Sequence, residues 1–299
     1  MTSQAVSDRL TTETLRSLSP QLRKAARYVV EHPGEVATRS QRHVARTAKL
    51  SAPTFTRLAH AIGYDSYDEL RDLCRAEVMQ PRTLLAEKAQ TLVEAGSETP
   101  DKTAFFTQHA LAGVQNIETS LGHLDHDDLG ALVTRLAKAR RVVLVGVMSA
   151  RPILEYTAYI ANMSLGGWSL LGRDGDGAAG ILADLGPEDA ALVFSIAPYA
   201  ATSVALARHL KAANVPVIAV TDNHLSPLTE GAQHCVYLST GSPQFFPSHV
   251  AAMVFFEAVI GMVIRERGGD SQRKIARVEL QNHELGEYWQ DKPARDKGD

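Results

Sequence analysis

The sequence predicts an all-α bundle followed by a doubly wound α/β domain built on a five-stranded parallel sheet. Apolar residues recur at helical spacing between residue 19 and about residue 81. In the first predicted helix they are Leu22, Ala25, Ala26, Val29 and Val30. From Arg141 onward, short β-branched runs alternate with helical stretches. Continuous apolar strands separated by helices are typical of a parallel sheet that is covered on both faces.

The composition is that of a folded, water-soluble protein of two domains. The chain has 299 residues, with 44% hydrophobic and 22% charged residues, close to globular averages. The net charge of -3 argues against a chain whose whole surface binds nucleic acid, but it says nothing about local basic patches. Cys74 and Cys235 lie far apart and have no metal-ligand spacing. We therefore expect no metal, no cofactor, no disulfide framework and a reducing, cytoplasmic location.

Neither the N-terminus nor the most apolar stretch predicts a membrane role. The first 18 residues lack the apolar core and the cleavage site of a secretion signal. Residues 250–264 are apolar but shorter than a membrane span, and they include Glu257. This stretch is therefore interpreted as a buried helix or a subunit interface.

Helix signals divide the N-terminal half of the chain. A helix that begins near Ser19 ends at residues 32–34, His-Pro-Gly. The remaining periodic stretches predict helices over residues 40–48, 52–62, 66–78, 103–121 and 126–138. Residues 96–100, Gly-Ser-Glu-Thr-Pro, have the composition of an interdomain linker.

Five apolar runs predict the strands of the second half, at residues 142–147, 168–171, 190–196, 215–221 and 235–238. The resulting domain boundaries are residues 1–82 for the helical bundle, 83–124 for a helical linker and dimerisation segment, 125–270 for the α/β domain, and 271–299 for a polar C-terminal tail.

One segment of the helical bundle is basic in an acidic protein. Residues 36–64 contain five Lys and Arg residues and no Asp or Glu. Neutralising DNA phosphates needs such a cluster, whereas a solvated helix normally mixes both signs. Within this segment a helix, a tight turn and a second helix follow in order, so the sequence predicts a helix-turn-helix that binds double-stranded operator DNA.

Ser51 is placed to cap the second helix, and Pro53 is tolerated in its first turn. Phe55, Leu58 and Ile62 are expected to pack inward, which leaves the start of that helix for the DNA groove. The predicted DNA-binding residues are Arg39, Arg42, Arg46, Lys49, Ser51, Thr54, Thr56 and Arg57.

These residues carry a resemblance to a known family. The pattern Ser51-x-x-Thr54-Phe55-x-Arg57, followed by Ile62-Gly63-Tyr64, resembles the helix-turn-helix of RpiR-family transcription regulators. In that family the helix-turn-helix is fused to a sugar isomerase (SIS) domain, which the α/β half of this chain resembles. The resemblance implies a regulator that responds to a sugar-derived, anionic metabolite.

Two loops depart from the SIS pattern. The first loop, Gly-x-Gly-x-Ser in that family, has Met148 and Ala150 in place of the second Gly and the Ser. The second, Ser-x-Ser-Gly-x-Thr, has Ala197, Pro198 and Ala200 at its last three marked positions. These changes predict either a sugar acid or a phosphosugar held in an altered way.

Ligands of parallel α/β sheets bind beyond the carboxyl ends of the strands, where helix N-termini offer free amides. The first and third strands are expected to be neighbours, so the loops that follow them should face one cleft. The predicted effector-binding residues are Ser149, Arg151, Ser195, Tyr199, Thr202, Ser203, Thr221 and Ser248.

Two other functions stay open on the sequence. A sugar-phosphate isomerase-like enzyme with a DNA-binding appendage needs a base, and the predicted loops offer Asp222, His224, His249 and Glu257 without an evident pair. An interaction module would use the α/β half only to dimerise. The preferred hypothesis is a non-enzymatic regulator. We expect a homodimer or homotetramer, because paired helix-turn-helix units bind palindromic sites.

Overall fold

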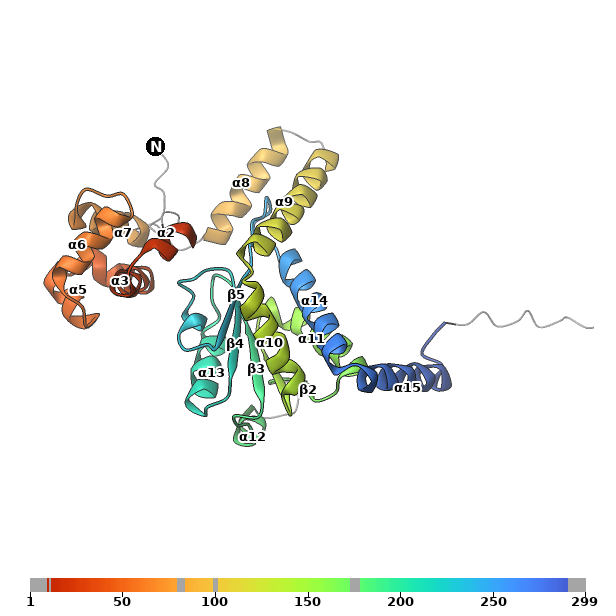
Figure 1. Ribbon diagram of the computed structural model, residues 1–299. Helices are drawn as coiled ribbons and strands as arrows, with labels where there is room; N and C mark the ends of the chain where they lie inside the picture. The colour runs from red at the N-terminus through yellow and green to blue at the C-terminus, as the bar shows by residue number, and fades with distance from the viewer. Residues whose placement is uncertain (1–9, 11, 80–83, 99–101, 173–177, 290–299) are drawn as a thin grey trace, which may run out of the picture. The chain divides into compact units, whose positions relative to one another are not determined.

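The computed structural model describes residues 10, 12–79, 84–98, 102–172 and 178–289 of the chain. These residues form two compact units, one consisting mainly of N-terminal helices and one containing the sheet (Figure 1). Within the described part, no helix is long and apolar enough to cross a membrane.

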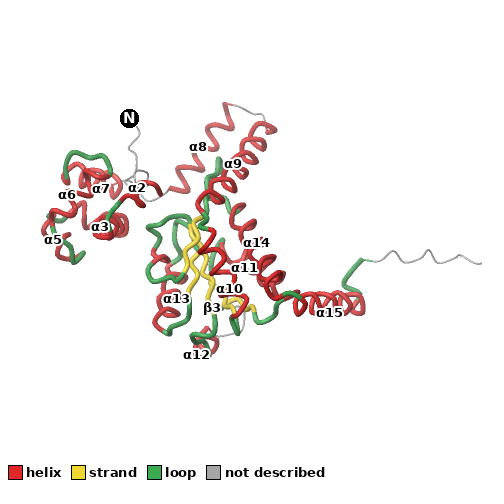
Figure 2. Tube along the Cα trace, viewed as in Figure 1, coloured by secondary structure: helices red, strands yellow, loops and turns green. Residues whose placement is uncertain are grey.

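The N-terminal unit is all helical, as Figure 2 shows. Its helices are α2 (Thr12–Ser17), α3 (Pro20–Glu31), α4 (Pro33–Thr38), α5 (Gln41–Thr47), α6 (Ala52–Ala61), α7 (Tyr67–Met79) and α8 (Leu84–Glu98). Phe55, Leu58 and Leu70 lie fully buried at its centre. The expected inward packing of Phe55, Leu58 and Ile62 is confirmed. Helices α2 and α4 were not expected.

Local hydrogen bonds explain where α5 and α6 end. Lys49 has a φ of 54°, and the amide of the next residue, Leu50, donates to Ala45 O at 2.9 Å. Gly63 has a φ of 87°, and the Tyr64 amide donates to Ala59 O at 2.9 Å. Both are Schellman caps, which need one residue in the left-handed region. The four residues between α5 and α6 therefore form a defined turn.

The second unit contains, among the described residues, a five-stranded sheet in which all strand pairs are parallel. The strands are β1 (Val142–Val145), β2 (Trp168–Leu170), β3 (Ala190–Phe194), β4 (Val217–Thr221) and β5 (His234–Tyr237), in the order β2-β1-β3-β4-β5. The second unit also contains the end of α9 (Lys102–His123) from Val114 onward, and α10 (His126–Lys138), α11 (Ala150–Ser164), α12 (Ala178–Ala183), α13 (Ala201–Ala212), α14 (Val250–Arg267) and α15 (Gly269–Leu285). The start of α9 and the 3₁₀ turn η1 (Pro227–Thr229) belong to the first unit.

Helices cover both faces of the sheet, with α13 on one face and α10, α11 and α14 on the other (Figure 1). The central strands β1, β3 and β4 are buried along their whole length. On the α14 side the core is formed by side chains such as Leu144, Phe194 and Phe256. Phe194 and Phe256 meet edge to face, with ring centroids 5.4 Å apart. The predicted fold class is thus confirmed.

Several predicted boundaries need correction. Each strand was placed within two residues of its observed start or end. Residues 271–285 of the predicted polar tail are helical in α15 and mainly exposed. Helix α8 continues through Glu98, so the first three residues of the predicted linker are helical. Thr99, Pro100, the boundary at residue 82 and the end of the tail lie outside the described residues.

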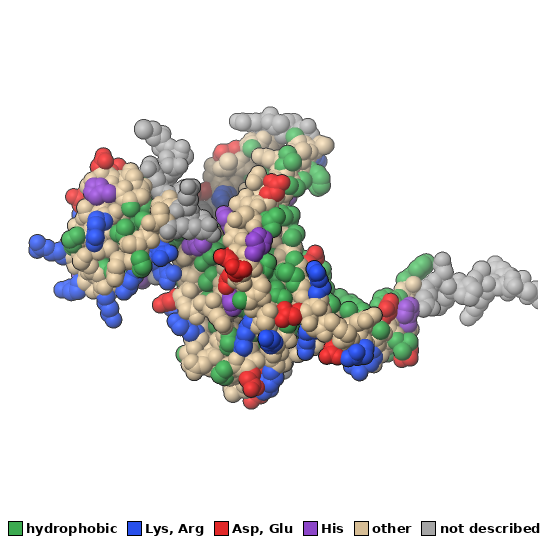
Figure 3. Space-filling view, in the orientation of Figure 1, with side chains coloured by type: hydrophobic (Ala, Val, Ile, Leu, Met, Phe, Trp, Pro, Cys, Tyr) green, Lys and Arg blue, Asp and Glu red, His purple; other side chains and the backbone are tan. Residues whose placement is uncertain are grey.

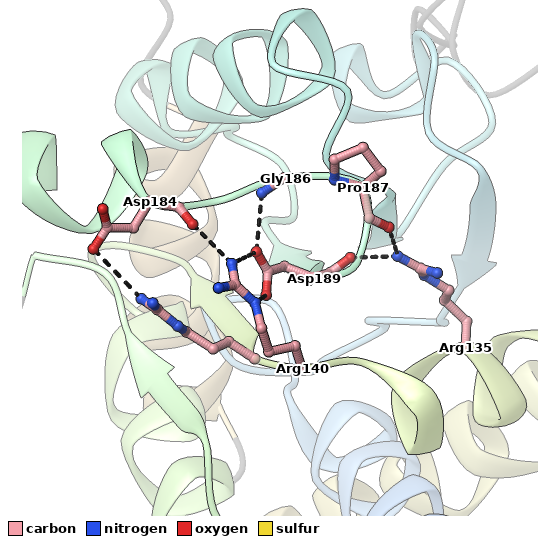
Figure 4. A network of polar contacts seen from close by, with 7 residues as sticks. Arg135, Arg140, Asp184, Gly186, Pro187 and Asp189 are labelled. Carbon is pink, nitrogen blue, oxygen red and sulfur yellow. Dashed lines mark hydrogen bonds and ion pairs between the residues drawn. The ribbon is translucent and has the colours of Figure 1, made fainter.

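A network of arginines ties the amino ends of β1 and β3 together (Figure 4). Arg140 donates to both carboxylate oxygens of Asp189, at 3.0 and 2.7 Å, and also to Asp184 O at 2.9 Å. Arg135, in the last turn of α10, donates to Asp189 O at 2.6 Å and to Pro187 O. This edge lies opposite the carboxyl ends of the strands, so the network serves the fold.

Candidate functional sites

The first candidate site is the basic surface of α5, the following turn and α6. Its five cations, Arg39, Arg42, Arg46, Lys49 and Arg57, all have exposed side chains. Figure 3 shows Lys and Arg side chains projecting from the N-terminal unit. Arg42, Arg46 and Arg57 lie on helices, whereas Arg39 and Lys49 flank α5 at its two ends.

The predicted hydroxyl contacts divide into exposed and buried positions. Ser51 is exposed at the start of α6, and Thr56 is half-buried. Thr54 is only 4% exposed, and its hydroxyl lies 2.8 Å from that of Ser51. A side chain in this position stabilises the start of α6 and does not reach a DNA groove. We therefore remove Thr54 from the proposed DNA surface.

Gln41 is a residue of this surface that the sequence reasoning missed. Its amide nitrogen donates to Ala52 O at 2.9 Å and to the Thr56 hydroxyl at 2.7 Å. These bonds join the first turn of α5 to the first turn of α6 and orient Thr56. Gln41 is neither a cation nor a hydroxyl, and the sequence signal for it is its position directly after the cap residue Ser40.

The second candidate site is the carboxyl edge of β1 and β3. These strands are neighbours, with Val145 opposite Val193, so the loops that follow them emerge side by side as expected. A Cβ on Gly146 would lie 2.6 Å from Leu154 Cδ1 and 3.1 Å from Phe194 O. Glycine therefore permits the first loop to pass close to β3.

The hydroxyls at the ends of β3 and β4 bond mainly to the protein itself. Ser195 Oγ accepts from the Ala200 amide at 3.2 Å, and the Thr221 hydroxyl donates to Ser195 O at 2.8 Å. The Tyr199 hydroxyl donates to Asp222 Oδ1 at 2.9 Å. These bonds pin the β3–α13 loop onto the end of β4.

The remaining predicted effector residues vary in exposure. Ser149 is half-buried and precedes α11 without capping it, while Thr202 is exposed in the first turn of α13. Ser203 is fully buried, and its hydroxyl has no hydrogen-bond partner among the described residues. Ser248 is buried just before α14.

Arg151 was expected to supply positive charge to an anionic ligand. Its guanidinium instead donates to Glu155 Oε1 at 3.0 Å and to Gly172 O at 2.9 Å. The neighbouring carboxylate offsets this charge, so Arg151 contributes less to an anion site than the sequence predicts.

The candidate bases Asp222, Glu257 and His249 make contacts within the protein. Asp222 is bound by the β3–α13 loop, and Glu257 accepts from the Tyr156 hydroxyl at 2.7 Å. Burial lowers the pKa of His249, whose ring packs edge to face on Phe194 at 5.6 Å. Among the described residues, no group of three or more His, Cys, Asp and Glu side chains is arranged to hold a metal ion.

Comparison with known proteins identifies the second unit. Residues 135–262 match the SIS domain family model, and this region is a SIS domain. The sugar isomerase domain of an RpiR transcription factor from Sphaerobacter thermophilus aligns with 60% of this chain and 98% of its own, at 21% identity and a TM-score of 0.52. No curated protein sequence matches the chain.

A second structure aligns along both units. The Vibrio vulnificus NanR protein, solved in complex with ManNAc-6P, covers 94% of this chain and 98% of its own, at 18% identity and a TM-score of 0.53. A proposed sugar-phosphate isomerase from Listeria monocytogenes covers 60% and 98%, at 18% identity and a TM-score of 0.51. At identities this low, the structural alignments establish a shared fold and nothing more.

Proposed function

We propose that the chain is a DNA-binding transcription regulator of the RpiR type, whose SIS domain binds a sugar-derived effector. The observation that carries this proposal is the basic, acid-free surface of α5 and α6, joined in one chain to a SIS domain. The NanR alignment over 94% of the chain supports the combination of the two parts.

The geometry of the helical pair fits a helix-turn-helix. A Schellman cap at Lys49 forms the turn, Gln41 joins the two helices, and the apolar side of α6 is buried. Arg42, Arg46 and Arg57 remain exposed for phosphates or base edges. In this proposal α6 is the recognition helix and α5 supports it against the DNA backbone.

The proposed assembly is a homo-oligomer joined through the SIS domain. On α14, Val250 and Val254 are 40% and 42% exposed, and Ala258 and Gly261 continue the same stripe. A second copy of the chain covering this stripe would remove apolar surface from water and pair two helix-turn-helix units for a palindromic operator.

The test begins by selecting bound sequences from a randomised duplex pool with the full-length protein. A palindromic consensus is expected, with affinity that falls steeply as salt rises. Operator titrations with a panel of sugars and sugar derivatives then identify the effector. Failure to enrich any sequence would refute DNA-binding regulation.

A companion assay follows conversion of sugar phosphates by the purified protein. Turnover would establish the isomerase-like alternative.

Ser149→Ala combined with Tyr199→Phe should abolish the effector's influence on DNA while leaving effector-free operator binding intact. An unchanged effector response in this double variant would place the effector site elsewhere.

A further inference from the structure

A short stretch of chain between β4 and β5 belongs to the N-terminal unit, although it lies within the sheet-containing half of the sequence. The chain leaves the second unit after Asp222 and returns to it at Glu230. We call the intervening residues, Asn223–Thr229, the η1 segment, because they include the turn η1. Few contacts normally cross the boundary between two domains, so this segment is an exception in the fold.

Two side chains attach the η1 segment to the helices of the N-terminal unit. Leu225 is 5% exposed and belongs to the same hydrophobic core as Phe55 and Leu58. Arg27, on α3, donates from Nη2 to the hydroxyl oxygen of Thr229 at 3.0 Å, across 202 positions of the sequence. An apolar anchor and a charge-assisted hydrogen bond therefore fix the segment at two points.

Hydrogen bonds within the η1 segment hold it in one shape. Asn223 Oδ1 accepts from the Leu225 amide at 2.8 Å, and Asn223 O accepts from the Ser226 amide at 3.0 Å. The Thr229 hydroxyl donates to Ser226 O at 2.9 Å, which leaves its lone pairs to accept from Arg27. A displacement at the start of this closed turn is therefore passed on to Thr229.

The residues directly before the η1 segment are bonded to the β3–α13 loop, where we place the effector. The Thr221 hydroxyl donates to Ser195 O at 2.8 Å. Asp222 accepts from the Ala197 amide at 3.2 Å and from the Tyr199 hydroxyl at 2.9 Å. Bonded contacts thus run without a break from this loop, through Asp222 and the η1 segment, to α3. Contiguous networks of this kind carry energetic coupling between sites.

The loop that follows β5 repeats this arrangement. Gly241–Ser248 also belongs to the N-terminal unit, and its last residue is one of the predicted effector residues. Just before it, the Ser239 amide donates to Ser120 Oγ at 2.8 Å, and the Ser239 hydroxyl donates to Asn116 Oδ1 at 2.8 Å. These bonds fix the end of β5 to α9. The carboxyl ends of β4 and β5 are thus both continued by chain that belongs to the N-terminal unit.

We propose that the η1 segment couples the effector edge of the SIS domain to the helix-turn-helix unit, with Arg27 and Thr229 as positioning residues. The proposed coupling rests on the proposed function of the chain as an effector-controlled DNA-binding regulator. A ligand that moves the β3–α13 loop displaces Asp222 and the η1 segment, and the contacts of Leu225 and Thr229 pass this displacement to the helices. Coupling is reciprocal, so operator DNA bound by the N-terminal unit acts on the effector edge in return.

The experiment measures amide hydrogen exchange in the full-length protein, with the operator duplex that the protein selects as the probe. The amides of Ala197 and Ala200 report on the effector edge, because both are hydrogen-bonded there. Operator binding should slow the exchange of residues 197–200 in the wild type at least about fivefold, which is the low end of ordinary coupling between two sites. Arg27→Met keeps an apolar stem but removes the guanidinium, and it should abolish this slowing while the operator is still bound.

Thr229→Val and Thr229→Ser test the same bond from the other side. Valine removes the acceptor and should behave as Arg27→Met, whereas serine keeps the hydroxyl and should behave as wild type. The double variant Arg27→Met with Thr229→Val should match either single variant, because both remove one shared interaction. Arg23→Met is the matched control, because Arg23 is an exposed arginine of the same helix, and it should keep the slowing.

Operator titration of the wild type comes first, and a failure to bind any operator refutes the proposed function itself. If the operator is bound but residues 197–200 exchange as in the free protein, the coupling alone is refuted. Undiminished slowing in Arg27→Met would also overturn it, and so would loss of the slowing in Arg23→Met, which would assign the effect to the charge of α3. Circular dichroism confirms the fold of each variant, and Arg27→Met decides the outcome if Thr229→Val does not fold.

Discussion

The guanidinium of Arg140 forms a two-point ion pair with the carboxylate of Asp189, and the Asp189 side chain is fully buried where β3 begins. Gly186 adds a third hydrogen bond to the same carboxylate, at 2.9 Å. Burial alone would raise the pKa of Asp189, but the hydrogen bonds from Arg140 and Gly186 outweigh burial and lower it. The ion pair thus joins the amino ends of two central strands.

Asp189→Asn should lower the free energy of unfolding by about 2 to 3 kcal/mol, because it removes a charged acceptor from a buried network. Chemical denaturation of the full chain at neutral pH measures this loss. A variant as stable as wild type would show that solvation of the half-exposed Arg140 replaces the pair.

The same pair predicts the pH dependence. Because the folded-state pKa of Asp189 lies below its unfolded value, its contribution is present above the unfolded pKa, near 4, and is lost as pH falls through the folded pKa. The stability difference between wild type and Asp189→Asn should therefore be constant at neutral pH and shrink in acid. A difference that grows on acidification contradicts this assignment.

Lys49→Gly should separate stability from DNA binding. Lys49 occupies the left-handed position of the cap that ends α5, where glycine is favoured, so the free energy of unfolding should rise by about 0.5 to 1 kcal/mol. Operator affinity should nevertheless fall, because one exposed cation is lost, and the salt dependence should become shallower. Unchanged affinity would remove Lys49 from the interface.

Arg57→Ala should weaken operator binding by about 1 to 3 kcal/mol if the side chain reads a base, with the fold unchanged. A phosphate role would instead weaken all DNA sequences alike. Arg23→Ala, an exposed arginine of α3 outside the acid-free segment, is the matched control. Equal affinities of the two variants would argue against α6 as the recognition helix.

Val254→Asp should dissociate the proposed homo-oligomer, because it places a charge in the exposed apolar stripe of α14. Light scattering should report a halved mass or a smaller assembly, and operator affinity should fall as the second DNA contact is lost. Ala205→Asp places the same charge at an exposed position of α13 and should leave the mass unchanged. A monomeric wild-type protein would contradict the proposed assembly.

The sequence by itself determined the fold class, because apolar periodicity is a local property that can be detected without any tertiary contact. The runs around β1, β3 and β4 are buried along their whole length, and such runs occur in few other settings. The sequence also predicted the basic surface between Val36 and Tyr64, because a segment without acidic residues can be recognised from composition alone.

Only the tertiary structure decided which of the predicted site residues still have hydrogen-bonding capacity to offer. Thr54 bonds to Ser51, Arg151 to Glu155, and Tyr199 to Asp222. The contact between Tyr199 and Asp222 links loops that follow two different strands, and its geometry depends on the sheet that brings those strands together. Residue types indicate what a side chain can bind, whereas the three-dimensional contacts decide what it already binds.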